Sequence, residues 1–147
     1  MTTRAQVVSE ARRWVGTRWR HQGYDRVSGC DCFGLIAGVA HSLSLPGMKR
    51  WYVTPEYHNY APQPDPRLLI RCCDELFDRV GDAAARLADV LVLRFASEPV
   101  HFALLSCEVP RRVIHALARP GRVVENGFSE APGNLLYRVY RFRGLED

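Results

Sequence analysis

Residues 29–36 read Gly29-Cys30-Asp31-Cys32-Phe33-Gly34-Leu35-Ile36, and they predict the start of a helix that packs on a sheet. Asp31 is a residue type that caps helix N-termini. From Cys32 onward, apolar residues recur at helical spacing up to about Leu43. Small residues at positions 34, 37 and 38 permit close packing, and Pro46-Gly47 ends the pattern.

This placement puts Cys32 in the first turn of the helix. Unpaired backbone N–H groups and the positive end of the helix dipole stabilise a thiolate there. Such surroundings lower the pKa of a cysteine from about 8.5 by one to several units. Cys32 is therefore a candidate nucleophile, and the small Gly34 would let a substrate backbone come close. The alternative is that Cys32 is a small buried apolar residue, as free cysteines usually are.

Two further helices are predicted. The first is capped by one of the threonines at positions 2 and 3 and ends at Gly16. Its apolar stripe is Val8, Ala11 and Val15. The other helix opens at Asp65-Pro66, a cap followed by a first-turn proline, and runs to about Val80. Residues 16–31 and 46–65 are predicted to be irregular, and the aromatic residues of the second segment either wall a cleft or cover the sheet.

After Gly81 the pattern changes to short β-branched or aromatic runs separated by Pro, Gly and charged residues. The predicted strands are 89–95, 101–107, 112–117, 122–126 and 136–142. Helices followed by strands indicate an α+β fold in which a helix packs on an antiparallel meander sheet of about five strands. The 147 residues fit one domain, residues 1–147.

The composition is that of an ordinary globular protein, with 47% hydrophobic and 24% charged residues. The net charge of +4 is scattered along the chain, so we expect no nucleic-acid partner. No apolar run approaches the roughly 20 residues that span a bilayer, and the N-terminus lacks the apolar core of a secretory signal. We therefore expect synthesis in the cytoplasm without a signal peptide and no membrane insertion.

The five cysteines do not form a recognisable disulfide framework, because their count is odd and their spacing suits no stapled mini-domain. A zinc site is a possible use for the cysteines and histidines. However, the usual two-residue spacing between paired ligands is missing, and adjacent Cys72 and Cys73 point apart on a helix. We therefore expect no metal and no cofactor.

Two histidines lie on either side of the turn-forming residues 108–111. If the flanking strands form a hairpin with its turn centred near Glu108, His101 faces His115 on one side of the sheet, with Cβ atoms about 5 Å apart. A shift of one residue would send the two side chains to opposite faces. As a pair, they are candidates for a base and the group that orients it, as in nucleophile–base–orienter triads.

Several motifs, in order along the chain, resemble the NlpC family of papain-like cysteine peptidases. The family's Asp-Cys-x-Gly-(Leu/Phe), which opens the nucleophile helix, matches residues 31–35. Its His-x-Ala-aliphatic-Leu strand matches residues 101–105, and Ile-His-Ala on the next strand matches 114–116. The copies carried by tailed phages and gene transfer agents add Gly-Thr-x-aromatic-x-His-Gln-Gly, which matches residues 16–23. The likeness extends through residues 122–126 to Phe142.

The resemblance implies a papain-like fold and a catalytic set in which Cys32 is the nucleophile, His101 the base and His115 the orienting residue. It also suggests residues that bind substrate or complete an oxyanion site, namely Trp19, His21, Gln22, Tyr24, Asp31 and Gly34.

Two positions depart from the family pattern. Many relatives have a tyrosine ahead of the nucleophile whose hydroxyl helps to position the reacting groups. The matching position here is Trp19, although Tyr24 lies nearby. The Gly-Asp pair that opens the first strand in relatives is Ala88-Asp89, a change expected to alter only a turn.

By the same resemblance, the substrate is the stem peptide of bacterial peptidoglycan, cut at or beside the bond between D-glutamate and a diamino acid. The phage branch further implies a place in a tail, with tail-tip or baseplate hub proteins as partners. Two alternatives remain open: amide or acyl transfer on the same scaffold, and a structural tail component without activity.

Overall fold

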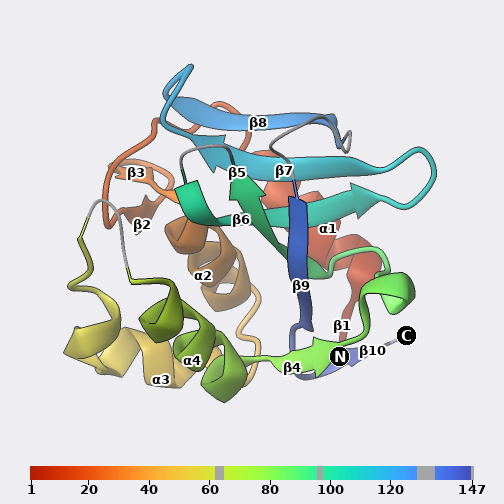
Figure 1. Ribbon diagram of the computed structural model, residues 1–147, viewed down its shortest axis with the longest axis horizontal. Coiled ribbons are helices and arrows are strands. Elements are labelled where there is room, and N and C mark those ends of the chain that lie inside the picture. The colour runs from red at the N-terminus through yellow and green to blue at the C-terminus, as the bar shows by residue number, and fades with distance from the viewer. Residues whose placement is uncertain (62–64, 96–97, 129–134, 147) are drawn as a thin grey trace.

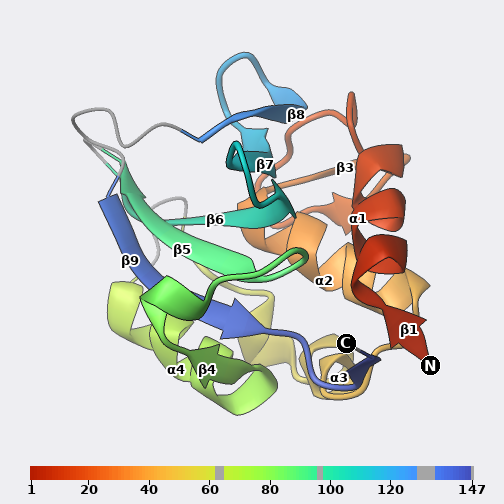
Figure 2. The same cartoon turned by 90° about the vertical axis from the view of Figure 1, so that its right-hand side faces the viewer.

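The computed structural model describes residues 1–61, 65–95, 98–128 and 135–146 (Figure 1). Its helices are α1 (Arg4–Arg13), α2 (Cys32–Ser42), α3 (Met48–Val53) and α4 (Pro66–Leu76), with 3-10 turns η1 (Pro55–Tyr57) and η2 (Asp82–Ala84). The main sheet contains β4 (Asp78–Val80), β5 (Val90–Phe95), β6 (Glu98–Cys107), β7 (Arg112–Leu117), β8 (Arg122–Gly127) and β9 (Leu135–Arg141). Short strands β1 (Thr2–Thr3) and β10 (Leu145–Glu146) pair near the two chain ends (Figure 2), and β2 (Tyr24–Asp25) pairs with β3 (Gly29–Cys30).

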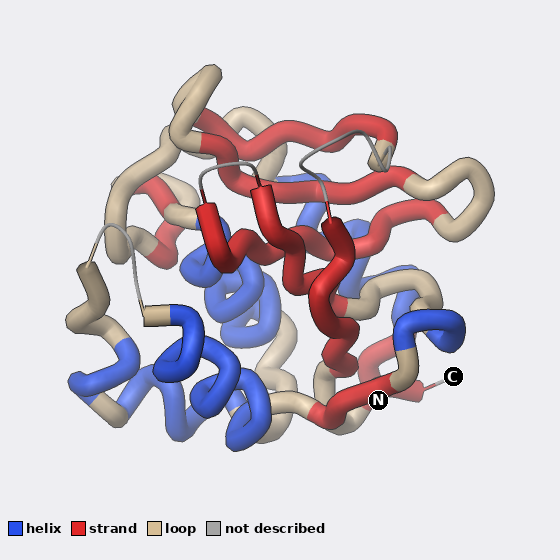
Figure 3. Tube along the Cα trace, viewed as in Figure 1, coloured by secondary structure: helices blue, strands red, loops and turns tan. Residues whose placement is uncertain are grey.

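The main sheet is antiparallel, with the strand order β4-β9-β5-β6-β7-β8 (Figure 3). The five predicted strands are confirmed, and β4 adds a sixth. A plain meander was wrong, because β9 does not follow β8 at the edge but returns to pair with β5 and β4. Val139 and Tyr140 are neighbours in β9 and both have no exposed surface. Successive side chains in a strand point to opposite faces, so β9 is covered on both faces and belongs inside the sheet.

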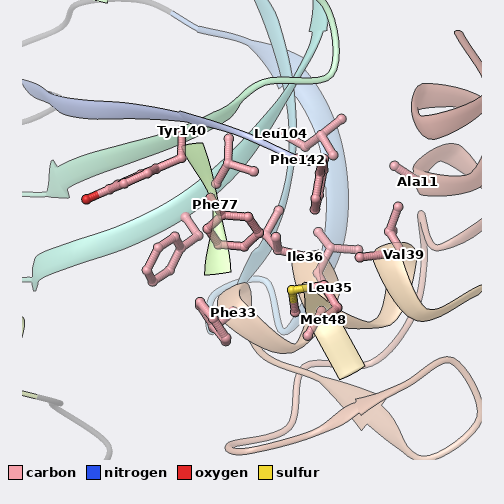
Figure 4. Packing of buried hydrophobic residues seen from close by; sticks show 14 of the residues in the cluster. Ala11, Phe33, Leu35, Ile36, Val39, Met48, Phe77, Leu104, Tyr140 and Phe142 are labelled. Atoms are coloured by element: carbon pink, nitrogen blue, oxygen red, sulfur yellow. The ribbon is translucent and has the colours of Figure 1, made fainter. Parts of the chain in front are cut away.

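Helix α2 lies at the centre of the molecule, in contact with the sheet on one side and with α1 on another. Residues 33–40 are all buried, and several of them pack against the sheet and the C-terminal strand region (Figure 4). The small residues predicted to permit close packing do so at Gly38, where a Cβ would lie 2.1 Å from the Trp14 ring. A helix that is apolar all round needs such coverage on every side.

Helix α1 begins as predicted but ends earlier. Thr3 is its N-cap and forms a reciprocal capping box with Gln6. The helix ends at Arg13, so Val15 falls outside its apolar stripe and is 45% exposed. The prediction that Val15 faces the core was therefore wrong. Trp14 fills that space instead and is 3% exposed.

Helix α4 has the predicted cap, since the Asp65 side chain accepts a hydrogen bond from the Arg67 N–H and Pro66 occupies the first turn. It ends at Leu76 rather than near Val80, because residues 78–80 pair with β9 as strand β4. Residues 46–65 were predicted to be irregular, yet they contain α3 and η1. These elements are short, so the sequence shows too few turns for a helical period to stand out.

A buried carboxylate connects the start of β5 to both ends of the chain. Asp89 has no exposed surface, and it accepts hydrogen bonds from Arg4 at 3.1 Å and from Arg141 at 2.9 and 2.7 Å. The Arg86 backbone N–H donates a fourth bond at 2.8 Å. Ala88 before it has a φ of 70°, in the left-handed region that favours glycine, at the position where the family resemblance leads to an expectation of glycine.

Candidate active site

Cys32 is the first residue of α2, directly after a side-chain cap. The Oδ1 atom of Asp31 accepts a hydrogen bond from the Gly34 N–H at 2.8 Å, and the Asp31 carbonyl accepts one from the Leu35 N–H at 3.0 Å. The predicted cap is therefore confirmed. Cys32 is half-buried, whereas Cys30 on the preceding strand has no exposed surface. The chain thus presents the sulfur at position 32 at the helix N-terminus and packs the sulfur at position 30 into the core.

Three other cysteines are poor nucleophiles. Burial raises the pKa of Cys30 to about 12, and the charge of Asp31 acts in the same direction. Burial likewise raises the pKa of Cys72 to about 12 and the pKa of Cys73 well above its ordinary value. These thiols stay protonated at neutral pH, and only the thiolate attacks carbonyl carbon. Cys107, like Cys32, is half-buried.

The cap itself is held by a tyrosine that is distant in sequence. The Oδ2 atom of Asp31 accepts hydrogen bonds from the Gln22 N–H at 2.8 Å and from the Tyr60 hydroxyl. Asp31 is 5% exposed, and this burial raises the pKa of its carboxyl group despite these hydrogen bonds. Burial and the charge of Asp31 raise the pKa of Tyr60, so the phenol keeps its proton and remains a donor.

Sequence reasoning did not single out Tyr60 as a site residue. It lay in an aromatic stretch that could either wall a cleft or cover the sheet, and no local pattern links it to Asp31. A phenol hydroxyl does lie at the start of α2, but it belongs to Tyr60, downstream in the sequence, rather than to the position matched by Trp19.

His101 on β6 and His115 on β7 lie together, as predicted. His101 Nε2 and His115 Nδ1 are 3.0 Å apart, and the ring centroids are 5.1 Å apart. Both residues are buried, at 2% and 5% exposure. A hydrogen bond of this length fixes the two rings relative to each other.

The register that brings them together is not the predicted one. In the observed hairpin Leu104 faces Ile114, whereas the predicted turn would pair Leu104 with Arg112, so the register differs by two positions. His101 and His115 are therefore diagonal neighbours rather than a directly facing pair. A shift of two keeps both side chains on one face, and diagonal neighbours are within reach of aromatic rings.

A third side chain extends this pair, and it was not among the predicted site residues. Asn126 on β8 places its Oδ1 atom 3.0 Å from His115 Nε2. Its strand had been predicted and matched to the family, but Asn126 had not been named as a site residue. The signal that could have found it is the β7–β8 register, which pairs His115 with Val124 and so puts Asn126 diagonal to His115 on the same face.

The first turn of α2 packs against the part of β6 that carries His101. Phe33, next to Cys32, meets Phe102 of β6 edge to face with ring centroids 4.9 Å apart. Helix α2 contacts both β6 and β7. The nucleophile candidate and the histidine pair therefore belong to neighbouring, directly packed elements.

A cavity of about 250 Å³ opens beside the histidine pair. His115 and Asn126 form the polar part of its wall, and Leu93, Val113 and Phe128 contribute apolar surface. The site thus combines a hydrogen-bonded imidazole pair with an adjoining hollow of mostly apolar lining.

Within the part of the chain that the structure describes, no three His, Cys, Asp or Glu side chains gather as a metal ion would require. No helix among the described residues is long and apolar enough to cross a bilayer.

Solved structures provide the comparison that decides the fold. The superposition on the NlpC/p60 domain of the peptidoglycan hydrolase SagA covers 96% of this chain and the whole of that domain, with a TM-score of 0.59 and 19% identity. Against NlpC1 from Trichomonas vaginalis the TM-score is 0.65 at 13% identity, over 95% of this chain and 44% of that one. Against the peptidoglycan hydrolase RipB from Mycobacterium tuberculosis it is 0.51 at 18% identity, over 92% and 62%.

The chain has the NlpC/p60 fold. The predicted α+β, papain-like architecture is therefore confirmed. The chain spans less than half of the Trichomonas protein, so it corresponds to one part of that longer relative. No sequence-family model and no curated protein matches the chain.

Within the NlpC/p60 fold, the remaining predicted site residues lie in the loop before α2. The His21 ring meets Tyr60 edge-on with centroids 5.5 Å apart, and the Gln22 side chain donates to the Tyr60 carbonyl at 2.7 Å. Both therefore adjoin the cap of α2. Trp19 is half-buried, and its backbone N–H donates to the Gly121 carbonyl at 2.8 Å. Tyr24 lies edge-on to the ring of Trp51 at 5.1 Å.

Gly34 permits a contact different from the one expected. A Cβ at this position would lie 1.7 Å from the carbonyl oxygen of Gly23, a backbone atom. The space beside Gly34 is therefore filled by the chain's own loop rather than left open for a substrate. This contact holds the 16–31 loop against the first turn of α2.

Replacing Gly34 with alanine is expected to destabilise the protein by about 2–3 kcal/mol, because a backbone carbonyl cannot move aside as a flexible side chain can. Urea unfolding measures the change. Gly81→Ala is the matched control, since no described atom lies within 4 Å of a Cβ there and its φ is −67°. Equal stability of Gly34→Ala and wild type would contradict the packing described for this loop.

The buried histidines predict a loss of stability in mild acid. Burial, and to a lesser extent His115, lowers the pKa of His101 from 6.5 to about 3. Burial also lowers the pKa of His115, against a smaller opposite effect of Asn126. Below the pKa of about 6.5 that these histidines have in the unfolded chain, the unfolded chain binds protons on them whereas the folded chain keeps them neutral. Folding stability therefore falls as pH decreases. His101 alone is expected to contribute a loss of about 2 kcal/mol between about pH 7 and pH 5.

Urea unfolding across this pH range tests the effect in wild type and in His101→Gln. Asp31, whose pKa is raised, has the opposite pH dependence, but it is present in both proteins and cancels in the difference between the two profiles. Parallel profiles for the two proteins would show that His101 is not kept neutral by the fold.

Proposed function

We propose that this chain is a cysteine peptidase that hydrolyses the stem peptide of bacterial peptidoglycan. The observation that carries the proposal is the hydrogen-bonded pair of His101 and His115 on strands that pack against the helix beginning at Cys32. The half-burial of Cys32 supports it, since a nucleophile needs access to substrate. The NlpC/p60 fold is shared with domains of proteins named as peptidoglycan hydrolases.

In the proposed mechanism, the Cys32 thiol gives its proton to His101 Nδ1, because Nε2 is engaged with His115. The sulfur attacks the carbonyl carbon of the peptide bond. The C–N bond then breaks, the leaving amine takes the proton from His101, and a thioester remains on Cys32. A water molecule gives a proton to His101 and attacks the thioester, which releases the acid and restores the thiol.

The start of α2 has a second role in the proposed mechanism. Backbone N–H groups at the helix N-terminus stabilise the negative oxygen of the tetrahedral intermediate, a contribution of about 3 kcal/mol per donor. Asp31 uses the N–H groups of Gly34 and Leu35 to hold the first turn in shape. Its links to Gln22 and Tyr60 keep that turn in a fixed position relative to the loop.

We further propose that the bond cut lies at or beside D-glutamate and a diamino acid, and that the chain works in the tail of a phage or phage-like particle. The sequence motifs at residues 16–23, 31–35, 101–105 and 114–116 support both. In this proposal the chain is assembled into the tail in the cytoplasm, and its partners are tail-tip or baseplate hub proteins.

The test is digestion of purified peptidoglycan and of soluble stem peptides by the intact chain, with mass spectrometry of the products. New amino termini on the diamino acid are expected, and prior treatment with iodoacetamide should block their appearance. A chelator should leave the rate unchanged. Products formed equally well after complete alkylation of Cys32 would refute a thiol mechanism, and cleavage within the sugar strand would refute the peptidase.

A further inference from the structure

Three side chains on three neighbouring strands form one hydrogen-bond chain. His101 on β6 contacts His115 on β7 through Nε2 and Nδ1, and His115 Nε2 contacts the Oδ1 atom of Asn126 on β8, each at 3.0 Å. The hydrogen bonds therefore form one continuous series from Asn126 through His115 to His101.

Counting the protons on the two rings shows which atom donates and which accepts in each of these hydrogen bonds. A neutral imidazole carries one N–H and one lone pair on its two ring nitrogens, and an amide oxygen can only accept. The contact with Oδ1 therefore requires the His115 proton on Nε2, which leaves a lone pair on Nδ1. That lone pair requires a proton on His101 Nε2, so the lone pair of His101 lies on Nδ1. Burial supports neutral rings, since it lowers the pKa of both histidines.

We infer that Asn126 is a positioning residue that sets the direction of this hydrogen-bond chain and thereby keeps the lone pair of His101 on Nδ1, the nitrogen that receives the proton of Cys32. Reversal of the amide would present its N–H₂ group to His115 and reverse each donor and acceptor. His101 would then carry its proton on Nδ1 and could not act as a base. The inference rests on the proposed function for its catalytic consequence but not for the tautomer itself.

The position of Asn126 makes this role separable from folding. The residue is exposed on β8, and its side chain forms part of the cavity wall beside His115. Exposed positions usually tolerate substitution with little change in stability. Asn126→Ala removes the acceptor, whereas Asn126→Asp retains an acceptor and has no N–H to donate at neutral pH. The two variants therefore distinguish an accepting role from a donating role.

The experiment measures the ring tautomers directly. Protein carrying ¹⁵N-labelled histidine and Cys32→Ala is examined by long-range ¹H–¹⁵N correlation at mildly alkaline pH. Both His101 and His115 are expected to carry their proton on Nε2, and Asn126→Asp should keep this pattern. Asn126→Ala should give a mixture of tautomers at His115 and His101. A proton on Nδ1 of His101 in the protein that retains Asn126 would overturn the inference. An unchanged pattern of ring tautomers in Asn126→Ala would overturn it as well.

The rate of stem-peptide hydrolysis, measured in protein that retains Cys32, provides the second readout. Asn126→Ala is expected to lower kcat by roughly 10–100-fold with little change in KM, the size typical of losing a group that orients another. Asn126→Asp should recover most of that loss, and failure to do so would count against an accepting role. Glu125→Gln is the matched control, because Glu125 is adjacent on β8 and its carboxylate pairs with Arg12. If no variant or wild type cuts stem peptides, the proposed function fails while the tautomer result still decides the inference.

Discussion

Replacing Cys32 with alanine is expected to reduce stem-peptide hydrolysis to the uncatalysed background, a loss of at least about 10³-fold. Without the sulfur no thioester can form, and His115 cannot replace it, because both of its ring nitrogens are engaged in hydrogen bonds. Release of new amino termini from soluble stem peptide measures the effect. The fold should survive, since alanine retains the Cβ and is compatible with the first turn of a helix.

Cys107→Ala is the control for this experiment. Cys107 is half-buried like Cys32, but it lies at the end of β6 and outside the proposed site, so its loss should leave the rate unchanged. Iodoacetamide labelling should follow the same division. Cys32 is expected to react far ahead of Cys30, Cys72 and Cys73, whose burial raises their pKa values. Hydrolysis retained in Cys32→Ala would end the peptidase proposal.

Replacing Asp89 with asparagine is expected to destabilise the fold by about 3–5 kcal/mol, the usual cost of leaving buried charges without their partner. The Asp89 carboxylate is fully buried and compensates Arg4, which is 6% exposed, as well as Arg141. An asparagine side chain has no charge and only one acceptor oxygen. Urea unfolding at neutral pH measures the change. The loss should persist at high salt, because ions do not reach the buried pair effectively.

Asp78→Asn tests whether burial is what matters. Asp78 also pairs with an arginine, Arg143, at 3.1 Å, but its side chain is 65% exposed. A pair of this kind typically contributes less than about 1 kcal/mol. A similar loss in both variants would show that the Asp89 cluster stabilises no more than a surface ion pair does.

Local sequence identified the features that depend on neighbours in the chain. The cap at Asp31 followed by Cys32 required only residue types within one helical turn, and the same holds for the Thr3 and Asp65 caps. The strands after Gly81 were recognisable from their composition. These features are set by backbone hydrogen bonding and side-chain type over a few residues.

Predictions failed where a local pattern was too short or where another element competed. Val15 continued the spacing of α1, but the helix ended first and Trp14 entered the core. Residues 78–80 continued the pattern of α4, but pairing with β9 made them a strand. In both places a tertiary contact outweighed a preference worth only tenths of a kcal/mol per residue.

The sequence by itself determined that Cys32 begins a capped helix and that His101 and His115 occupy positions of equal parity on consecutive strands. Only the tertiary structure decided the hairpin register, the insertion of β9 between β4 and β5, and the arrival of Tyr60 at Asp31 and of Asn126 at His115. The first set depends on repeats of two or about four residues, which are visible in the chain. The second depends on how separate elements fill a shared core and satisfy buried polar groups, which no single stretch of sequence specifies.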